Sequence, residues 1–160
     1  MESIPNVGRR AARRSASLDR TETYEFARTG NVAAGFAPLA VASNCPRDVV
    51  ESGLAHAGLL PYFTDIVVPD AILRPKPDPD VYLAAARACG APPSACLGVE
   101  DSYCGILSAS RAGLRILGVG ANPRSEELAL VDMWVPTFAD TALLDWAGSR
   151  EAVGETCARV

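Results

Sequence analysis

Strand-like and helix-like segments alternate along the chain from Pro38 onward, and this alternation constrains the fold more than any other feature. Short apolar runs predict strands at residues 39–43, 65–68, 95–99, 115–119 and 133–136. Apolar residues at helical spacing predict helices near residues 46–58, 79–89, 103–112, 124–130 and 140–147. Strands that alternate with helices form a parallel sheet with right-handed crossovers. The sequence therefore predicts an α/β fold.

Length and composition agree with one α/β domain and exclude several classes of function. The chain has 160 residues, of which 49% are hydrophobic, so it can bury a sizeable core. Its formal net charge of −4 favours neither nucleic acid nor an anionic membrane as a partner. No apolar run approaches the roughly 20 residues of a membrane span. The 5 cysteines are odd in number and form no CxxC pair, which predicts a reducing, cytoplasmic location.

Two adjacent carboxylates, Glu100 and Asp101, directly follow the apolar run at residues 96–99. Open α/β sheets bind ligands at the carboxyl ends of their strands. Paired carboxylates at such a place suit a hard cation such as Mg²⁺. The alternative is a solvated strand end, at which Asp101 or Ser102 caps the next helix. These residues alone support both interpretations.

Two further stretches end in groups that can hold a phosphoryl group. The apolar run at residues 39–42 is followed by the hydroxyl of Ser43 and the amide of Asn44. Lys76 stands between two prolines ahead of a predicted helix. A hydroxyl and an ammonium can bind phosphoryl oxygens, while a carboxylate-bound Mg²⁺ offsets the charge of the group.

In this order and context the three stretches resemble the motifs of the haloacid dehalogenase (HAD) superfamily, and most closely those of its β-phosphoglucomutase and phosphoglycolate-phosphatase-like branch. Ser43 matches the second motif, an apolar strand that ends in Ser or Thr. Lys76 opens a Lys-Pro-x-Pro turn, which matches the third motif, and the acidic pair matches the fourth. The likeness extends over about residues 38–146.

This resemblance implies a three-layer Rossmann-like parallel sheet and a phosphoryl-transfer reaction on a small, phosphosugar-like phosphate ester. In the family an Asp attacks the ester and an aspartyl-phosphate forms. The likeness assigns a catalytic role to Ser43 and Lys76, which hold phosphoryl oxygens together with Asn44. It assigns Mg²⁺ binding to Glu100 and Asp101. The implied partner is a small phosphorylated metabolite.

The family's first motif, which carries the nucleophile, has no counterpart in residues 1–38. That motif is Asp-x-Asp-Gly-Thr/Val after an apolar strand, and Asp19 has neither an Asp two residues on nor a Gly behind it. In the family this strand lies between the strands of the second and fourth motifs, so the sheet is expected to be incomplete at its N-terminal strand. Buried backbone groups need partners, so residues 31–37 or a partner chain are the candidates to complete it.

The chain is expected to divide into three parts. Residues 1–37 combine arginines with small residues and lack a sustained apolar period, which predicts a disordered or irregular N-terminal segment. Residues 38–148 form the HAD-like core domain, and residues 149–160 form a C-terminal tail. The family's helical cap domain, which normally follows the first motif and largely selects the substrate, has no room in this sequence.

Two classes of function remain open at this point. In the first, the chain is a HAD-type phosphatase or phosphomutase, impaired because the nucleophile Asp is missing. In the second, it is a non-catalytic, truncated or degenerate relative that binds phosphate or a protein partner. The motif set favours the first class for ancestry, and the missing nucleophile favours the second for the molecule as given.

Overall fold

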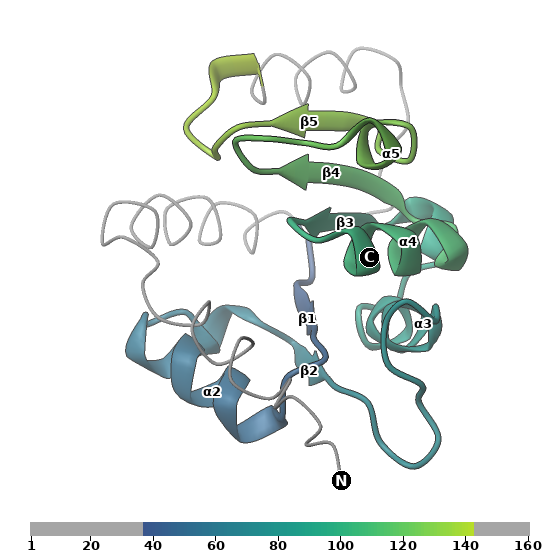
Figure 1. The fold of residues 1–160 in the computed structure, drawn as a ribbon. Coiled ribbons are helices and arrows are strands. Elements are labelled where there is room, and N and C mark those ends of the chain that lie inside the picture. The colour runs from purple at the N-terminus through teal and green to yellow at the C-terminus, as the bar shows by residue number, and fades with distance from the viewer. Residues whose placement is uncertain (1–36, 143–160) are drawn as a thin grey trace, which may run out of the picture.

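The structure is a computed structural model that describes residues 37–142 (Figure 1). The strands are β1 (Ala40–Ala42), β2 (Asp65–Val67), β3 (Leu97–Glu100), β4 (Arg115–Val119) and β5 (Met133–Val135). The helices are α2 (Arg47–His56), η3 (Leu60–Tyr62), α3 (Asp80–Ala88), η4 (Pro93–Ala95), α4 (Tyr103–Ala112) and α5 (Ser125–Leu128). The predicted α/β alternation is confirmed. The predictions for residues 1–36 and 143–160 lie outside the described residues.

The strand pairs of the described residues are all parallel, as predicted, and they form two sheets. In the first sheet β1 pairs with β2, with Val41 opposite Ile66. In the second sheet β4 lies between β3 and β5, with Leu117 opposite both Val99 and Met133. A helix connects the two strands of each parallel pair: α2 connects β1 to β2, α4 connects β3 to β4, and α5 connects β4 to β5. Figure 1 shows β1 and β2 between α2 and α3. This is the layered arrangement of a Rossmann-like fold.

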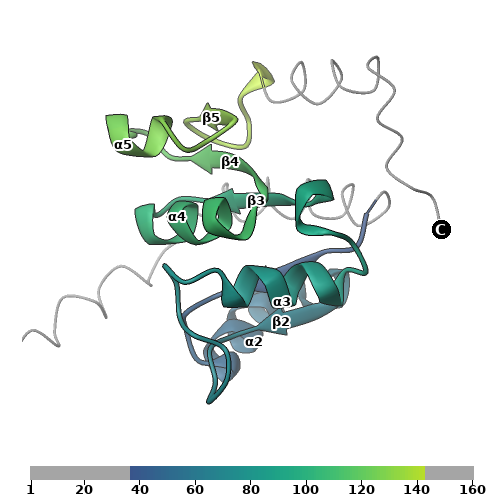
Figure 2. The same ribbon diagram turned by 90° about the vertical axis from the view of Figure 1, so that its right-hand side faces the viewer.

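Within residues 37–142, β1 and β3 each have one hydrogen-bonded strand neighbour, so each is an edge strand of its sheet. Figure 2 shows α3 lying between the first sheet and the layer of α4, so the two sheets share a helical cover. On β3, the side chains of Leu97 and Val99 are 45% and 43% exposed. Within residues 37–142 the strands therefore form two sheets that part between β1 and β3, and the missing strand at that place stays a prediction.

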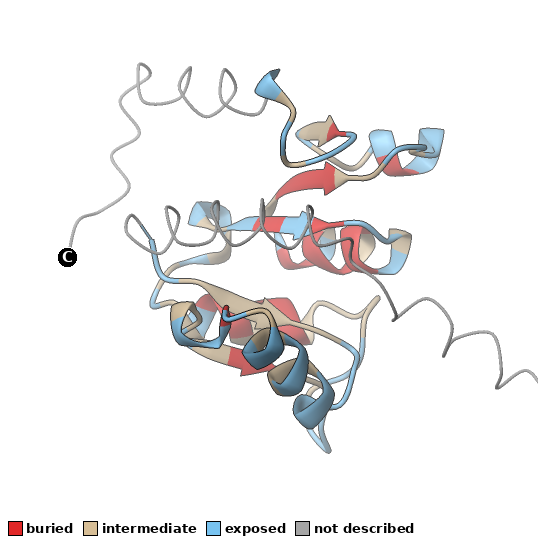
Figure 3. Ribbon diagram, turned by 90° about the vertical axis from the view of Figure 1, so that its left-hand side faces the viewer, coloured by how far each residue is buried: buried red, intermediate tan, exposed pale blue. Residues whose placement is uncertain are grey.

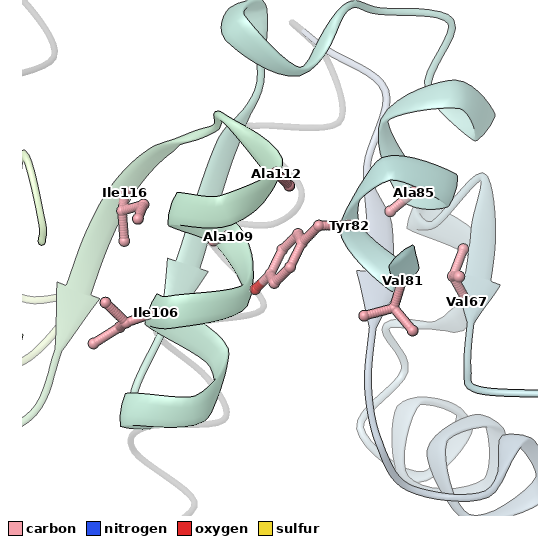
Figure 4. Close-up of a cluster of buried hydrophobic side chains, with 8 residues drawn as sticks. All are labelled: Val67, Val81, Tyr82, Ala85, Ile106, Ala109, Ala112 and Ile116. Carbon is pink, nitrogen blue, oxygen red and sulfur yellow. The ribbon is translucent and has the colours of Figure 1, made fainter. Parts of the chain in front are cut away.

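The core lies between the two sheets and the helices α3 and α4. Val81, Ile106 and Ala109 are fully buried, and Ile116 of β4 is 1% exposed. The close-up in Figure 4 shows Tyr82 reaching from α3 toward α4, with Val67 of β2 on the far side of α3. In Figure 3 the buried residues concentrate on α3, α4 and β4, whereas α2 buries none. The buried residues described thus gather around α3, α4 and β4.

Helix α4 begins and ends at the residues that the sequence predicted, because both ends are capped. At its N-terminus the Ser102 hydroxyl accepts a hydrogen bond from the Gly105 N–H at 3.2 Å. At its C-terminus Gly113 has a φ of 79°, a left-handed conformation that favours glycine. The cap places the residues directly after β3 at the start of a buried helix.

Across residues 37–142 we find no helix with both the length and the apolar character needed to cross a membrane.

Two glycines provide a matched test of the packing. A Cβ added at Gly118 lies 2.1 Å from the Trp134 ring, whose Nε1 donates to the Gly120 carbonyl at 2.7 Å. We expect Gly118→Ala to destabilise the protein by about 1–3 kcal/mol, since the ring must move. Gly53 lies in α2 with open space around it, so Gly53→Ala is expected to stabilise by roughly 0.5–1 kcal/mol. Urea unfolding measures both, and equal effects would contradict the packing described for Trp134.

Candidate active site

The loop between β2 and α3 carries Lys76, and the end of β1 holds this loop in place. The Lys76 N–H donates to Asn44 Oδ1 at 2.8 Å, and Asn44 Nδ2 donates to the Lys76 carbonyl at 3.1 Å. The Lys76–Pro77 peptide bond is cis. One amide side chain therefore satisfies both backbone groups of the lysine and fixes it beside the carboxyl end of β1.

Helix α4 holds the other side of the same loop. Ser108, which is fully buried, donates its hydroxyl to the Asp78 carbonyl at 2.5 Å. Arg111 donates to the Pro77 carbonyl at 2.9 Å. Side chains supply these donors because Pro75, Pro77 and Pro79 leave this part of the loop short of its own N–H groups. The loop is thus attached to both β1 and α4.

A charged pair fixes the entry into α3. Arg74 Nε and Nη2 donate to the two Asp80 carboxylate oxygens at 2.9 Å and 2.8 Å, and the Arg74 N–H donates to Oδ2 at 3.0 Å. These hydrogen bonds lower the pKa of Asp80 from 3.8 to about 2. Asp80 is the first residue of α3, where a carboxylate also interacts favourably with the helix dipole.

The ammonium of Lys76 forms an ion pair with Glu100 at the end of β3. The two side chains are only 10% and 7% exposed. Lys76 Nζ also lies 4.7 Å from the centroid of the Tyr82 ring, which is the geometry of a cation–π contact. The lysine predicted to hold a phosphoryl group therefore lies in a buried pocket of protein groups.

Both oxygens of the Glu100 carboxylate have protein partners. Oε1 accepts from Lys76 and from the Tyr82 hydroxyl, the latter at 2.5 Å. Oε2 accepts from the Ser102 hydroxyl at 3.1 Å. Gly105 leaves the space for this carboxylate, because a Cβ there would lie 1.9–2.2 Å from its carbon and oxygens.

Burial raises the pKa of the Tyr82 hydroxyl above its ordinary value, and the neighbouring Glu100 carboxylate raises it further. The phenol therefore keeps its proton and acts as a donor toward Glu100. The sequence predicted a helix near residues 79–89 from its apolar spacing and missed this role of Tyr82. A tyrosine within an otherwise apolar face was the available signal, because a buried hydroxyl needs a partner.

The two remaining candidates are more accessible. Ser43 is half-buried at the end of β1; its N–H donates to the Val67 carbonyl at 3.0 Å, and its hydroxyl accepts from the Cys45 N–H at 3.1 Å. Asp101 is exposed and lines an open recess at the carboxyl ends of β3 and β4. Side-chain contacts thus connect Asn44, Lys76 and Glu100 directly, with Ser43 and Asp101 as chain neighbours of this cluster.

The fit of this site to Mg²⁺ follows from its donors. Glu100 is occupied by Lys76, Tyr82 and Ser102, so Asp101 is the free carboxylate of the acidic pair. No group of three or more His, Cys, Asp or Glu side chains suited to a metal occurs within residues 37–142. In proteins Mg²⁺ usually binds one or two carboxylates together with substrate phosphates. A single carboxylate without a phosphate therefore makes a poor Mg²⁺ site. The described residues do not by themselves form a metal centre.

The fold and the site define an α/β protein with a lysine-centred cluster at the carboxyl ends of parallel strands. A profile of the haloacid dehalogenase-like hydrolases matches residues 31–119, which is more than half of the chain. The chain therefore belongs to the haloacid dehalogenase-like hydrolase family, and the resemblance to this family and to its phosphatases is confirmed. Its fold is also that of a β-phosphoglucomutase from Clostridium difficile, with a TM-score of 0.61.

Similar proteins include phosphatases of small phosphate esters. The chain is 38% identical over 96 residues to the validoxylamine A 7′-phosphate phosphatase of Streptomyces hygroscopicus subsp. limoneus, covering 60% of this chain and 45% of the relative. It is 34% identical over 106 residues to the fructose-1-phosphate phosphatase YqaB of Escherichia coli strain K12, covering 66% and 56%.

The fold matches the crystal structure of CbbY from Rhodobacter sphaeroides in complex with phosphate, with a TM-score of 0.58 and 32% identity. This match covers 76% of the chain and 53% of CbbY. The chain thus spans about half the length of these relatives.

The Arg74–Asp80 contact predicts a specific acid sensitivity. Because the pKa of Asp80 is lower in the folded protein, its contribution to stability is present above about pH 4 and is lost as the pH falls toward 2. We expect Asp80→Asn to be less stable than the wild type at neutral pH, with the difference vanishing near pH 2. Urea unfolding at several pH values measures this.

The matched control is Asp48→Asn in α2, whose side chain is exposed and forms no hydrogen bond in the structure. Because Asp48 also lies in the first turn of its helix, this variant loses the same kind of helix-dipole interaction but no hydrogen bond, so its stability should differ from the wild type by less than that of Asp80→Asn does. A difference between Asp80→Asn and wild type that persists unchanged to pH 2 would contradict the role given to the pair.

Proposed function

We propose that this chain is the phosphate-holding part of a HAD-type phosphatase that acts on a small, phosphosugar-like phosphate ester. The observation that carries the proposal is the cluster of Asn44, Lys76 and Glu100 at the carboxyl ends of β1 and β3, with Ser43 and Asp101 adjoining it. In this proposal Lys76 and Ser43 hold phosphoryl oxygens and Asn44 orients the lysine loop. The names of the phosphatases similar to this chain support the substrate class.

Mg²⁺ is the cation proposed for the complete site, and Asp101 is the donor that residues 37–142 offer to it. When bound, the cation would supply positive charge that compensates the phosphoryl group. Since Glu100 is engaged by Lys76, the further donors must be water, the phosphate itself or carboxylates from elsewhere. We assign no step of the reaction to the metal.

The attacking carboxylate of the family is proposed to come from a strand that completes the sheet between β1 and β3. Both are edge strands within the described residues, and Leu97 and Val99 of β3 are partly exposed. Edge strands present free backbone groups to which another strand can add. A partner chain is one source of such a strand. Free thiols at Cys45, Cys89 and Cys104 support the proposed cytoplasmic location.

A second candidate function is phosphate or partner binding without turnover. It is favoured by the divided sheet, because no carboxylate of residues 37–142 occupies a strand end between Ser43 and Asp101. Turnover distinguishes the two functions, because the first requires a nucleophile and the second does not.

We expect the chain alone to hydrolyse p-nitrophenyl phosphate at the background rate in the presence of Mg²⁺. The physical reason is that an aspartyl-phosphate requires a carboxylate aligned opposite Ser43 and Lys76. Release of p-nitrophenolate measures the rate, with Asp101→Ala as the matched control. Mg²⁺-dependent hydrolysis that Asp101→Ala abolishes would contradict the impairment and establish the chain as a phosphatase by itself.

We also expect weak and mutually dependent binding of Mg²⁺ and inorganic phosphate. Amide shifts of residues 43, 76 and 101 in a titration with both ligands measure it. Asp101→Ala should reduce the binding of both ligands. Lys76→Met should reduce phosphate binding, and is best made together with Glu100→Gln so that no unpaired carboxylate is left buried. If neither ligand shifts these residues in the wild type, the phosphate-holding proposal is wrong.

A further inference from the structure

We infer that Glu100 is the internal counter-ion of Lys76, and that Tyr82 is the positioning residue that fixes this pair for phosphate binding. The inference deepens the proposed function and rests on it for the role of Lys76. It divides the acidic pair between two tasks. Glu100 serves the lysine, and Asp101 alone faces the recess at the strand ends.

Three donors engage the carboxylate of Glu100. Its Oε1 accepts from the ammonium of Lys76 and from the phenol of Tyr82, and its Oε2 accepts from Ser102. The side chain is 7% exposed. These three donors occupy most of the roughly four acceptor sites of a carboxylate, and the burial of the side chain leaves little access for a metal. A buried carboxylate deprived of its partners is costly, so the structure favours the counter-ion role.

Tyr82 contacts both members of the ion pair. The same side chain binds Glu100 through its hydroxyl, at 2.5 Å, and Lys76 through its ring, with Nζ 4.7 Å from the centroid. Its ring is held in turn by α3, where Tyr82 is 6% exposed, and Figure 4 shows the side chain directed at α4. The tyrosine thus connects a rigid helix to both charged groups of the pair.

The backbone of α4 at Gly105 lies directly against the Glu100 carboxylate. Gly105 lies in the first turn of α4, and any Cβ at that position would overlap the Glu100 carboxylate at 1.9–2.2 Å. The backbone of α4 therefore approaches the carboxylate as closely as a glycine permits. The backbone of α4 and the hydroxyl of Tyr82 therefore restrict the position of the Glu100 carboxylate. The ion pair with Glu100 in turn restricts the position of the Lys76 ammonium.

The test compares Tyr82→Phe with the matched variant Tyr62→Phe in the full chain. The phenylalanine at position 82 keeps the ring contact and the packing, and removes only the donor to Glu100. Tyr62 lies in η3, outside the cluster, and its hydroxyl forms no hydrogen bond in the structure. The readouts are the NMR signal of the Lys76 side-chain ammonium and the affinity for inorganic phosphate in the presence of Mg²⁺.

We expect Tyr82→Phe to stay folded and to broaden the Lys76 ammonium signal through faster exchange with water. We also expect it to weaken phosphate binding by about tenfold, the lower end of the scale of one hydrogen bond to a charged group. Tyr62→Phe should leave both readouts unchanged. If Tyr82 acts through Glu100, adding Tyr82→Phe to Glu100→Gln should weaken phosphate binding by much less than it does in the wild type, since coupled residues are not additive.

The outcomes separate this inference from the proposed function. An unchanged Lys76 ammonium signal in Tyr82→Phe overturns the inference even if the wild type binds phosphate. A wild type that binds no phosphate overturns the proposed function, while the ammonium signal still reports whether Tyr82 positions the lysine. Gly105→Ala provides a second variant, because it should displace Glu100 and disturb the ammonium signal in the same way, whereas Gly53→Ala should not.

Discussion

The buried ion pair between Lys76 and Glu100 is the contact on which the rest of the site depends. It joins the loop after β2 to the end of β3, and so connects two sheets that share no backbone hydrogen bond within the described residues. Breaking a buried pair by removing one partner typically costs about 3–5 kcal/mol, because an uncompensated charge is left behind. The surrounding elements reflect this demand. Helix α3 supplies Tyr82 to the carboxylate, while Ser102 at the start of α4 supplies a hydroxyl to it and caps the helix.

The divided sheet explains why side chains carry so much of the connection. In a continuous parallel sheet the ladder hydrogen bonds between neighbouring strands would fix β1 relative to β3. Here side chains hold the strand ends near one another. Asn44 binds both backbone groups of Lys76, and Ser108 and Arg111 donate hydrogen bonds to carbonyls of the same loop. These contacts do not depend on a strand between β1 and β3, so the cluster can be assembled in a chain whose described part lacks one.

The sequence predicted the order of strands and helices because hydrophobic period and caps are local properties. Helix α4 was predicted to its exact bounds, since Ser102 and Gly113 mark its ends chemically. The partners of Glu100 were not predictable in this way. Because side chains alternate along a strand, Glu100 lies on the same buried face of β3 as Gly98, whereas Asp101 is exposed. Only the folded structure shows that Tyr82 and Lys76 contact Glu100 on that face. The resemblance therefore assigned one shared metal-binding role to both carboxylates. The apolar spacing of α3 gave no sign that Tyr82 donates a hydrogen bond to one of them.

The division of the acidic pair also determines the charge that an incoming anion meets. Glu100 offsets Lys76, and Asp101 adds a negative group at the exposed strand end, so one positive charge stands against two negative ones. Two unit charges 4 Å apart interact by about 1 kcal/mol in water and by about 4 kcal/mol near a protein surface. At that strength Asp101 repels a phosphate enough to offset much of what a shared lysine can contribute. A divalent cation held by Asp101, as proposed above, would reverse the sign of that interaction by supplying positive charge. Under the proposed function, Glu100 and Tyr82 would then position the Lys76 ammonium, while the cation would compensate the charge of the phosphate.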